Sequence, residues 1–361
     1  MNNKKNSNGR LTAIFFIFST ASINLLASDI YFSNQFAINH GLLSESYWRT
    51  ESFNTNPRKI LAYSDISIGA TSEVAGQTVF VERRKIATLN TNSNSLLAAS
   101  REMDELDYVS PGKYPLVAHL NKFQFEAAGL LFNGKLDHDV EWSLLPKFLK
   151  LNKYSIGDAD GELNIEPNAQ HLNASVSRQG SSKFGYTTQP TNIQIGAGVA
   201  LDANVKTKIN DYLVNLEIVN LFSRIPVNGS YYSERNYQIN TQSNALVFNS
   251  TPSLTGTYGQ TDANLQLPRI LKADIANGAP SSNWMQKAGV ISFQGGYIPW
   301  ASISYKLGEH NFSATTYQMN NLFLVYEKKN ILVRDFSFEA TMGVADHGKN
   351  QLLLTKLRYT F

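Results

Sequence analysis

Apolar and polar residues alternate one by one along much of this chain, and this period of two constrains its fold more than any other feature. From Ile195 to Val205 every odd position is apolar, and the even positions between them are small or polar. Val140, Trp142 and Leu144 alternate in the same way with polar neighbours. A period of two places side chains on opposite faces of an extended strand. We therefore expect an all-β protein.

Two further stretches show the same pattern. In one, Phe123, Phe125, Ala127 and Leu131 alternate with Lys122, Gln124 and Glu126, and in the other Phe336, Phe338, Ala340, Met342 and Val344 alternate with polar or small residues. A soluble β-sandwich alternates too, but a continuous apolar face opposite small and charged residues better fits a division between lipid and lumen. We expect the apolar faces to point outward.

Beyond residue 28 no segment has the length and apolarity of a membrane helix. A membrane-spanning chain of this kind must form a closed barrel, because lipid cannot satisfy open backbone groups. At about 25 residues per strand, the length predicts a transmembrane antiparallel up-and-down β-barrel of about 12 strands, with 10 to 14 possible. Polar stretches at 90–111, 155–194 and 231–283 are expected to be long extracellular loops. The first has a possible short helix from Ser95 to Leu106, the second a possible strand at its centre, and the third some strand character around Ala245–Phe248.

The first 28 residues have the pattern of a secretory signal peptide. Three basic residues precede an apolar run from Leu11 to Ala27, and small residues follow at Ala27 and Ser28. A membrane anchor is the alternative. Cleavage would leave one barrel domain over 29–361, with 29 basic and 29 acidic residues. A net charge of zero gives no argument for nucleic-acid binding. The chain has no cysteine, so neither disulfides nor cysteine-based zinc sites are available to it.

The chain ends in LLLTKLRYTF, in which Leu353, Leu357, Tyr359 and Phe361 alternate with polar residues. In this respect it resembles the Gram-negative outer-membrane β-barrel proteins as a class. The resemblance covers about ten residues and the general alternation. It implies a cell outer membrane location, outer-membrane lipid around the barrel, periplasmic chaperones, and recognition of the last strand by the barrel-assembly machinery. It implies no particular activity.

If the alternation is interpreted correctly, seven charged residues point into the lumen. In a wide barrel they would line an aqueous path, and in a narrow one they would pair with each other and close it. The two signs occur in similar number, which predicts weak charge selectivity or a salt-bridged lumen. The candidate pore-lining residues are Asp202, Lys206, Glu217, Asp335, Glu339, Lys356 and Arg358.

Other chemistry has little support in the sequence. Asp158, Asp160 and Glu162 surround Gly161 as in a fragment of a calcium loop, but the remaining ligands are missing, so we expect a polar turn and no metal. The six histidines have no metal spacing, and there is no G-x-S-x-G motif. No cofactor is predicted.

These observations favour a non-enzymatic, porin-like or export-associated channel for small polar solutes or a secreted polymer. The alternatives are a structural barrel that displays loops or serves a surface assembly, an outer-membrane barrel hydrolase with a histidine such as His138, His310 or His347, and a secreted β-rich adhesin outside any membrane.

Overall fold

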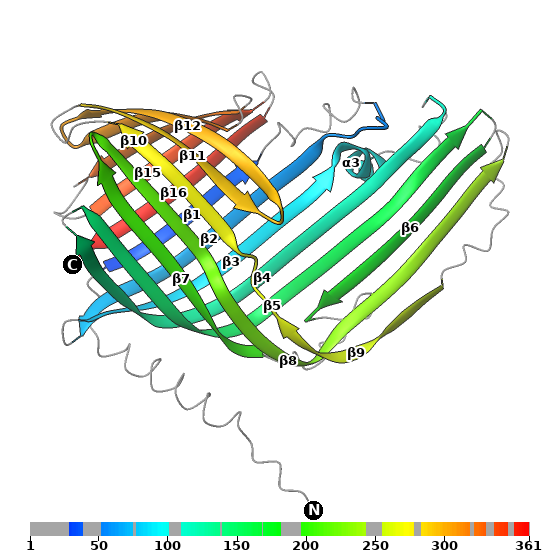
Figure 1. The fold of residues 1–361 in the computed structure, drawn as a ribbon, viewed down its shortest axis with the longest axis horizontal. Helices are drawn as coiled ribbons and strands as arrows, with labels where there is room; N and C mark the ends of the chain where they lie inside the picture. The colour runs from blue at the N-terminus through cyan, green and yellow to red at the C-terminus, as the bar shows by residue number, and fades with distance from the viewer. Residues whose placement is uncertain are drawn as a thin grey trace, which may run out of the picture.

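The computed structural model describes residues 29–38, 52–74, 77–100, 110–137, 139–167, 169–181, 196–242, 255–277, 283–317, 321–329, 336–345 and 350–360. The predicted signal peptide, residues 1–28, lies outside this set. Nearly all described residues belong to antiparallel strands (Figure 1). The one described helix, α3, has eight residues, and no described helix is long and apolar enough to cross a membrane.

The described chain contains sixteen strands and one helix. Their bounds are β1 Asp29–Ile38, β2 Lys59–Val74, β3 Gln77–Asn92, α3 Ser93–Ser100, β4 Gly112–Asp137, β5 Val140–Glu166, β6 Ala169–Gly180, β7 Gly196–Ile209, β8 Tyr212–Gln242, β9 Thr255–Leu265, β10 Ile270–Asn277, β11 Trp284–Phe293, β12 Gly296–Leu307, β13 His310–Tyr317, β14 Asn321–Lys329, β15 Phe336–Ala345 and β16 Asn350–Thr360.

Fourteen of the sixteen described strands close into a ring. Each strand from β1 to β5 pairs with the next, β5 pairs with β7, β7 with β8, β8 with β10, each strand from β10 to β16 with the next, and β16 with β1. This confirms the predicted antiparallel barrel, with a strand number at the upper limit of the expected range. The estimate of about 12 was low because strands and turns are short in places, with five strands between Ile270 and Lys329.

Two positions in the ring are each shared by two successive strands. Both β6 and β7 lie between β5 and β8, and both β9 and β10 pair with β8. We call the end of the ring where β16 finishes, at Thr360, the lower end, and the opposite end the upper end. β7 and β10 belong to the ring. Beyond its upper end, β6 takes the place of β7 beside β5 and β8, and β9 takes the place of β10 beside β8.

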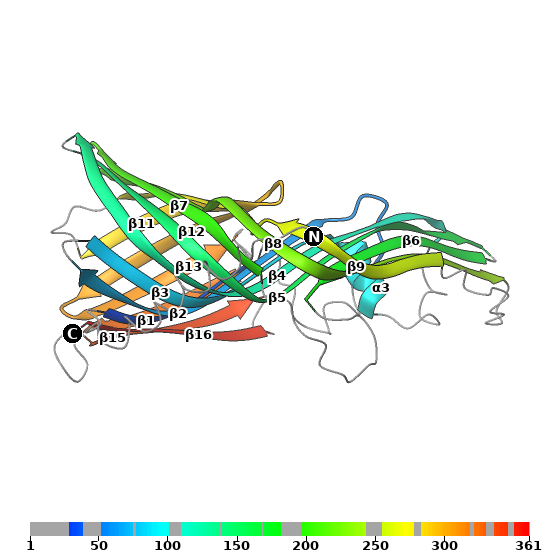
Figure 2. The ribbon, with the colours of Figure 1, turned by 90° about the horizontal axis from the view of Figure 1, so that it is seen from below.

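The strands β4, β5 and β8 are 26, 27 and 31 residues long and continue past the ring. Together with β6 and β9, their upper parts form an open sheet that we call the upper sheet. It extends to one side as a single layer, with α3 against it (Figures 1 and 2). The stretches 155–194 and 231–283 are therefore largely strands where they are described, and β6 agrees with the strand expected at the centre of the first, whereas Ala245–Phe248 lies outside the described set. The loops were predicted too long because a strand with polar residues on both faces lacks hydrophobic alternation.

Helix α3 covers the edge of β4 that β3 leaves unpaired. Asn92 Nδ2 donates to the Pro115 carbonyl at 3.0 Å, and Ser95 Oγ accepts the Val117 N–H at 2.6 Å. Leu97 packs with Tyr114 and Leu163 in a small cluster. These contacts give the backbone groups of an exposed edge the partners that a neighbouring strand would otherwise supply. The helix predicted near Ser95–Leu106 is confirmed for its first part, and residues 101–109 lie outside the described set.

Candidate functional site: an apolar luminal core above a polar vestibule

The outer wall of the ring carries an apolar belt. Strand register fixes which residues face outward, and large apolar side chains at these positions are solvent-exposed around the ring. Phe132 is 42% exposed and Leu322 is 48% exposed. Further members are Ile68, Leu144, Phe148, Val199, Val205, Leu216, Phe222, Ile275, Ile303, Phe312 and Leu324. Contiguous exposed apolar surface on this scale is typical of contact with a membrane.

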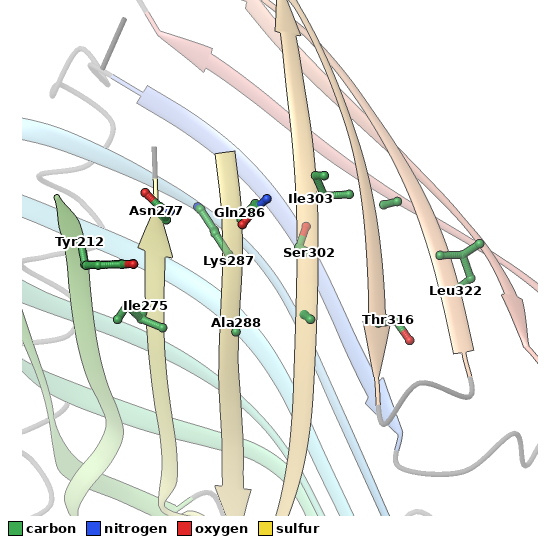
Figure 3. Close-up of a pocket in the computed structure, with 12 residues that line it drawn as sticks. Tyr212, Ile275, Asn277, Gln286, Lys287, Ala288, Ser302, Ile303, Thr316 and Leu322 are labelled. Atoms are coloured by element: carbon green, nitrogen blue, oxygen red, sulfur yellow. The ribbon is translucent and has the colours of Figure 1, made fainter. Parts of the chain in front are cut away.

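The belt contains an outward groove of about 550 Å³ across β10 to β14. Its floor is formed by the small residues Ala288 and Ala301, and Ile275 and Leu322 stand on either side. Figure 3 shows the labelled lining residues on adjoining strands of the near wall, with the opposite wall behind them. The groove therefore belongs to the outward surface of the ring and is separate from the lumen.

Two predicted outward faces are confirmed, and one is inverted. Val199 and Val205 on β7 and Leu144 on β5 are exposed outward. Phe123 and Phe125, however, are 2% and 0% exposed and lie inside the ring. Alternation shows that the two faces of a strand differ, but it does not show which one meets lipid. On β4 the polar outward residues Lys122, Gln124 and Glu126 lie above the apolar belt.

A packed apolar cluster, which we call the luminal core, lies in the upper half of the lumen. It is formed by inward residues from β2–β5, β7–β12 and the link after β9. They are Leu61, Tyr63, Phe80, Ile86, Phe123, Phe125, Ala127, Leu149, Leu151, Tyr154, Ala200, Val219, Ile225, Val227, Leu265, Leu267, Ile270, Ile291, Phe293 and Ile298. Because these strands come from opposite sides of the ring, the cluster joins facing walls of the lumen.

The β11–β12 hairpin completes the luminal core from above. Its two-residue turn, Gln294–Gly295, reaches across the lumen to β2 and β3, which are far from β11 and β12 around the ring. The Phe293 ring lies 6.1 Å from the Tyr63 ring between centroids. Figure 1 shows the hairpin extending over the interior of the barrel.

A chain of charged and polar contacts crosses the lumen against this core. Lys272 on β10 lies 3.5 Å from Glu217 on β8, and its Nζ is 5.9 Å from the centre of the Tyr63 ring on β2. The Tyr63 hydroxyl donates to Asp65 Oδ2 at 2.7 Å. Arg84 then binds Asp65 with two nitrogens, at 2.8 and 2.5 Å. Such a pair gives a rigid bidentate geometry.

A second buried ion pair fixes the opposite wall. The side chain of Lys147 is 0% exposed, and its Nζ lies 2.5 Å from Asp202 Oδ2. The other carboxylate oxygen of Asp202 accepts the Asn220 N–H at 2.8 Å. Asn220 has a φ of 55°, a conformation that asparagine adopts more readily than most residues, and lies at a shift in register between β7 and β8. The ion pair therefore also stabilises this bulge.

Below the luminal core, the described inward residues of β5, β7, β8, β10 and β11 are mostly polar. We call this region the vestibule; one part of it is a cavity of about 530 Å³ whose inward residues include Lys206, Asp274 and Lys287. A hydrogen-bonded row crosses its wall: Asn204 donates to Asn215 at 2.8 Å, and Asn215 donates to Asp274 at 2.8 Å. Groups of both charge signs thus face water here.

The structure places the seven predicted pore-lining residues as follows. Asp202 and Glu217 face inward and are paired with Lys147 and Lys272. Lys206 is exposed in the vestibule. Glu339 and Lys356 lie opposite each other in the register of β15 and β16, and Arg358 lies opposite Tyr31. The side chains of these last three, and all of Asp335, lie outside the described set.

Sequence reasoning missed the cationic partners Lys147, Lys272 and Arg84. A signal for one of them was present, because the inward odd positions of β5 that begin with Glu141 and Ser143 continue to Lys147. Nothing in the sequence indicated that β2 and β10 would meet across the lumen.

The last strand pairs on both sides, as ring closure requires. Leu357 lies opposite Phe32 on β1 and Phe338 on β15, and Tyr359 lies opposite Ile30 and Phe336. Leu353 lies opposite Met342. Phe361 lies outside the described set, so its proposed role in assembly stays a prediction.

The acidic segment Asp158–Glu162 is part of strand β5, so the predicted polar turn is wrong. Its three carboxylates follow one another at alternate positions, where a strand separates them by more than 6 Å. His119 contacts Asp158 at 2.8 Å, and Lys113 lies 3.7 Å from Glu162. Within the described residues, no group of three acidic or histidine side chains is arranged to hold a metal. Of the candidate catalytic histidines, His310 contacts the Tyr326 hydroxyl, whereas His138 and His347 lie outside the described set.

No protein-family model and no curated protein matches this chain. Among solved structures, one that is similar is described as a TodX deltaS2S3 mutant monoaromatic hydrocarbon channel. The TM-score is 0.40 and the sequence identity 8%, over 92% of this chain and 89% of that one. The interpretation of function therefore rests on the geometry of the barrel itself.

Proposed function

We propose that this chain is a non-enzymatic outer-membrane channel for small polar solutes, and that the described conformation is its closed state. The observation that carries the proposal is the contrast within one lumen. The vestibule has polar walls, as an aqueous path requires, whereas the luminal core joins facing walls across the same path above it. Passage requires the core to open. The outward apolar belt supports a membrane location.

The orientation follows the outer-membrane class that the last strand resembles. The lower end, where the chain finishes, faces the periplasm, and the upper sheet stands outside the cell. Lys113 tests this, because its side chain is 71% exposed on the upper sheet. A single cysteine at this position should react with a membrane-impermeant maleimide in intact cells. If the cysteine reacts only after the cells are lysed, the upper sheet faces the periplasm and the proposed orientation is wrong.

Conductance in a planar bilayer tests the channel itself. The refolded protein should be closed most of the time, with discrete openings. Because both charge signs line the vestibule, selectivity between anions and cations should be weak. Lys206→Gln should shift the reversal potential toward cations, whereas Lys122→Gln, the same change on the outward face of β4, should not. Complete absence of openings at every voltage rejects the channel.

The alternative of a structural barrel has one specific observation in its favour. The upper sheet is a large folded element beyond the ring, and a closed lumen would suffice to hold it at the cell surface. This function predicts no conductance in wild type or in any variant with a weakened luminal core. An opening in either case argues against it.

We also propose that the last strand is the part read by the barrel-assembly machinery. Support comes from the register, in which Leu353, Leu357 and Tyr359 share one face of a strand that closes the ring. Deleting Phe361 should reduce the amount of heat-modifiable, folded barrel in the membrane several-fold. Unchanged assembly of the truncated chain would contradict this role.

A further inference from the structure

The tip of the β11–β12 hairpin differs from the other walls of the lumen in how it is held. Its turn, Gln294–Gly295, has positive φ at both residues, 48° and 68°, as in a two-residue type I′ hairpin turn. Hydrogen bonds to this turn come from the opposite wall. Lys59 Nζ donates to the Gly295 carbonyl at 3.1 Å, and Asn90 Nδ2 donates to the Gln294 carbonyl at 3.1 Å.

These attachments are few and individually weak. Within the described residues, two side chains and two backbone carbonyls hold the turn, and the Lys59 contact is solvent-exposed. By contrast, each ladder of the barrel joins two strands through the backbone of many residues. Removing the tip from β2 and β3 would break side-chain contacts without opening a strand pair of the ring.

The closed position also leaves polar groups unsatisfied. Gln294 Oε1 and Thr88 Oγ1 are buried without a hydrogen-bond partner in the described structure. Buried groups without partners disfavour the conformation that contains them. Moving the tip toward solvent would hydrate Gln294. Among the described residues, apolar contacts and two hydrogen bonds from side chains favour the closed position against this opposing cost.

Gly296 allows the tip to approach β2. A Cβ atom built there would collide with the Leu61 side chain, while the inward Phe293 ring packs against Tyr63. The hairpin thus fits the luminal core only because residue 296 has no side chain. Ile298, which lies above the first β12–β13 pair, belongs to the same core and would leave it together with the tip, whereas Ile291 stays paired with Lys272 on β10.

We propose that the β11–β12 hairpin is the gate of this lumen: it moves as a unit away from β2 and β3, and its departure removes the upper wall of the luminal core. This inference rests on the proposed channel function. The moving part is therefore the tip from Phe293 to Pro299, and the ring stays closed because β11 remains paired with β10 up to Ser292 and β12 with β13 up to Trp300.

A disulfide lock gives the direct test, because the chain has no cysteine of its own. Leu61→Cys with Gly296→Cys places two thiols where the hairpin meets β2. The matched control is Lys85→Cys with Gln124→Cys, two residues that lie opposite each other on the outward face of β3 and β4, away from the lumen. Oxidation should abolish channel openings in the first pair and leave them unchanged in the second, and reduction should restore them.

Release of the gate should have the opposite effect. Lys59→Ala combined with Asn90→Ala should raise the open probability several-fold, and Gly296→Val should do the same by displacing Leu61. If the open probability is the same with the disulfide oxidised and reduced, the hairpin is not the gate, although the protein is still a channel. No openings in any variant would reject the channel.

A distance measurement tests the movement without relying on conductance. Spin labels at Tyr297, which is 66% exposed beside the turn, and at Lys85 on the β3 wall report the separation of the hairpin from β3. The released variant should add a population at longer distance, and the oxidised lock should show only the short one. A single short population in both would overturn the proposal.

Discussion

The lower and upper halves of β4 and β5 follow one chain direction but serve two different environments. Below, Phe132 and Leu144 face outward into the apolar belt while Glu141 and Ser143 face the lumen. Above, the polarity reverses: Phe123 and Phe125 pack inside, and Lys122 and Gln124 face out. The comparison shows that the apolar face of an alternating strand can point outward in one part of the strand and into the lumen in another. The medium at each height decides which face must be apolar.

The largest expected effect comes from the buried charges of the upper lumen. Arg84→Ala leaves Asp65 buried without its guanidinium partner and should lower the free energy of unfolding by about 3–5 kcal/mol. Lys206→Ala, in the hydrated vestibule, should change it by no more than about 0.5 kcal/mol. Urea unfolding in detergent micelles measures both. The double variant Arg84→Met with Asp65→Leu should recover most of the loss. If Arg84→Ala and Lys206→Ala lower the free energy of unfolding equally, the luminal core and the vestibule are not different environments.

The second prediction tests the outward face of β4 at two heights. Phe132→Arg places a charge in the apolar belt and should cost about 2–4 kcal/mol. Gln124→Arg, on the same face of the same strand but above the belt, should be nearly neutral. Folding equilibria in lipid vesicles provide the measurement. A large penalty at position 124 would mean that the belt extends higher than the exposed apolar residues indicate.

A smaller effect is expected where α3 covers the upper sheet. The Asn94 side chain accepts the Asn54 N–H at 3.0 Å and donates to the Asn54 and Pro115 carbonyls. Asn94→Ala should therefore cost about 1–3 kcal/mol and speed hydrogen exchange in the upper part of β4. Asn133→Ala, near the lower end of the same strand, serves as the control. Unchanged exchange near Pro115 would show that α3 does not protect this edge.

The smallest effect concerns a hydroxyl pair in the lower lumen. Thr315 Oγ1 donates to Ser302 Oγ at 2.9 Å. Because water can replace either partner in the vestibule, Thr315→Val should cost no more than about 1 kcal/mol. A double-mutant cycle with Ser302→Ala isolates the interaction. A coupling well above that value would indicate a drier vestibule than described.

The sequence predicted the barrel because its clearest alternation lies in ring strands such as β7, where Val199 and Val205 meet the belt. It could not predict the upper sheet, since β6 and the end of β8 carry polar residues on both faces and have no hydrophobic period. The pairing of Asp202 with Lys147 also escaped prediction, because it joins residues 55 positions apart through a register that only the folded sheet defines.

The shared positions in the ring have a mechanical consequence. Between the ring and the upper sheet, β6 ends opposite Ser155 and β7 begins opposite Leu151, so the position beside β5 passes from one strand to another there. The β4–β5 register shifts at Gln124/Phe125, and the β8–β9 register shifts between Val227 and Ser230. These irregularities fall where the upper sheet leaves the ring. Among the strands of the upper sheet, β4, β5 and β8 continue into the ring, so a force on the upper sheet would reach the barrel through these three strands and through β3, which pairs with β4 up to Ala118.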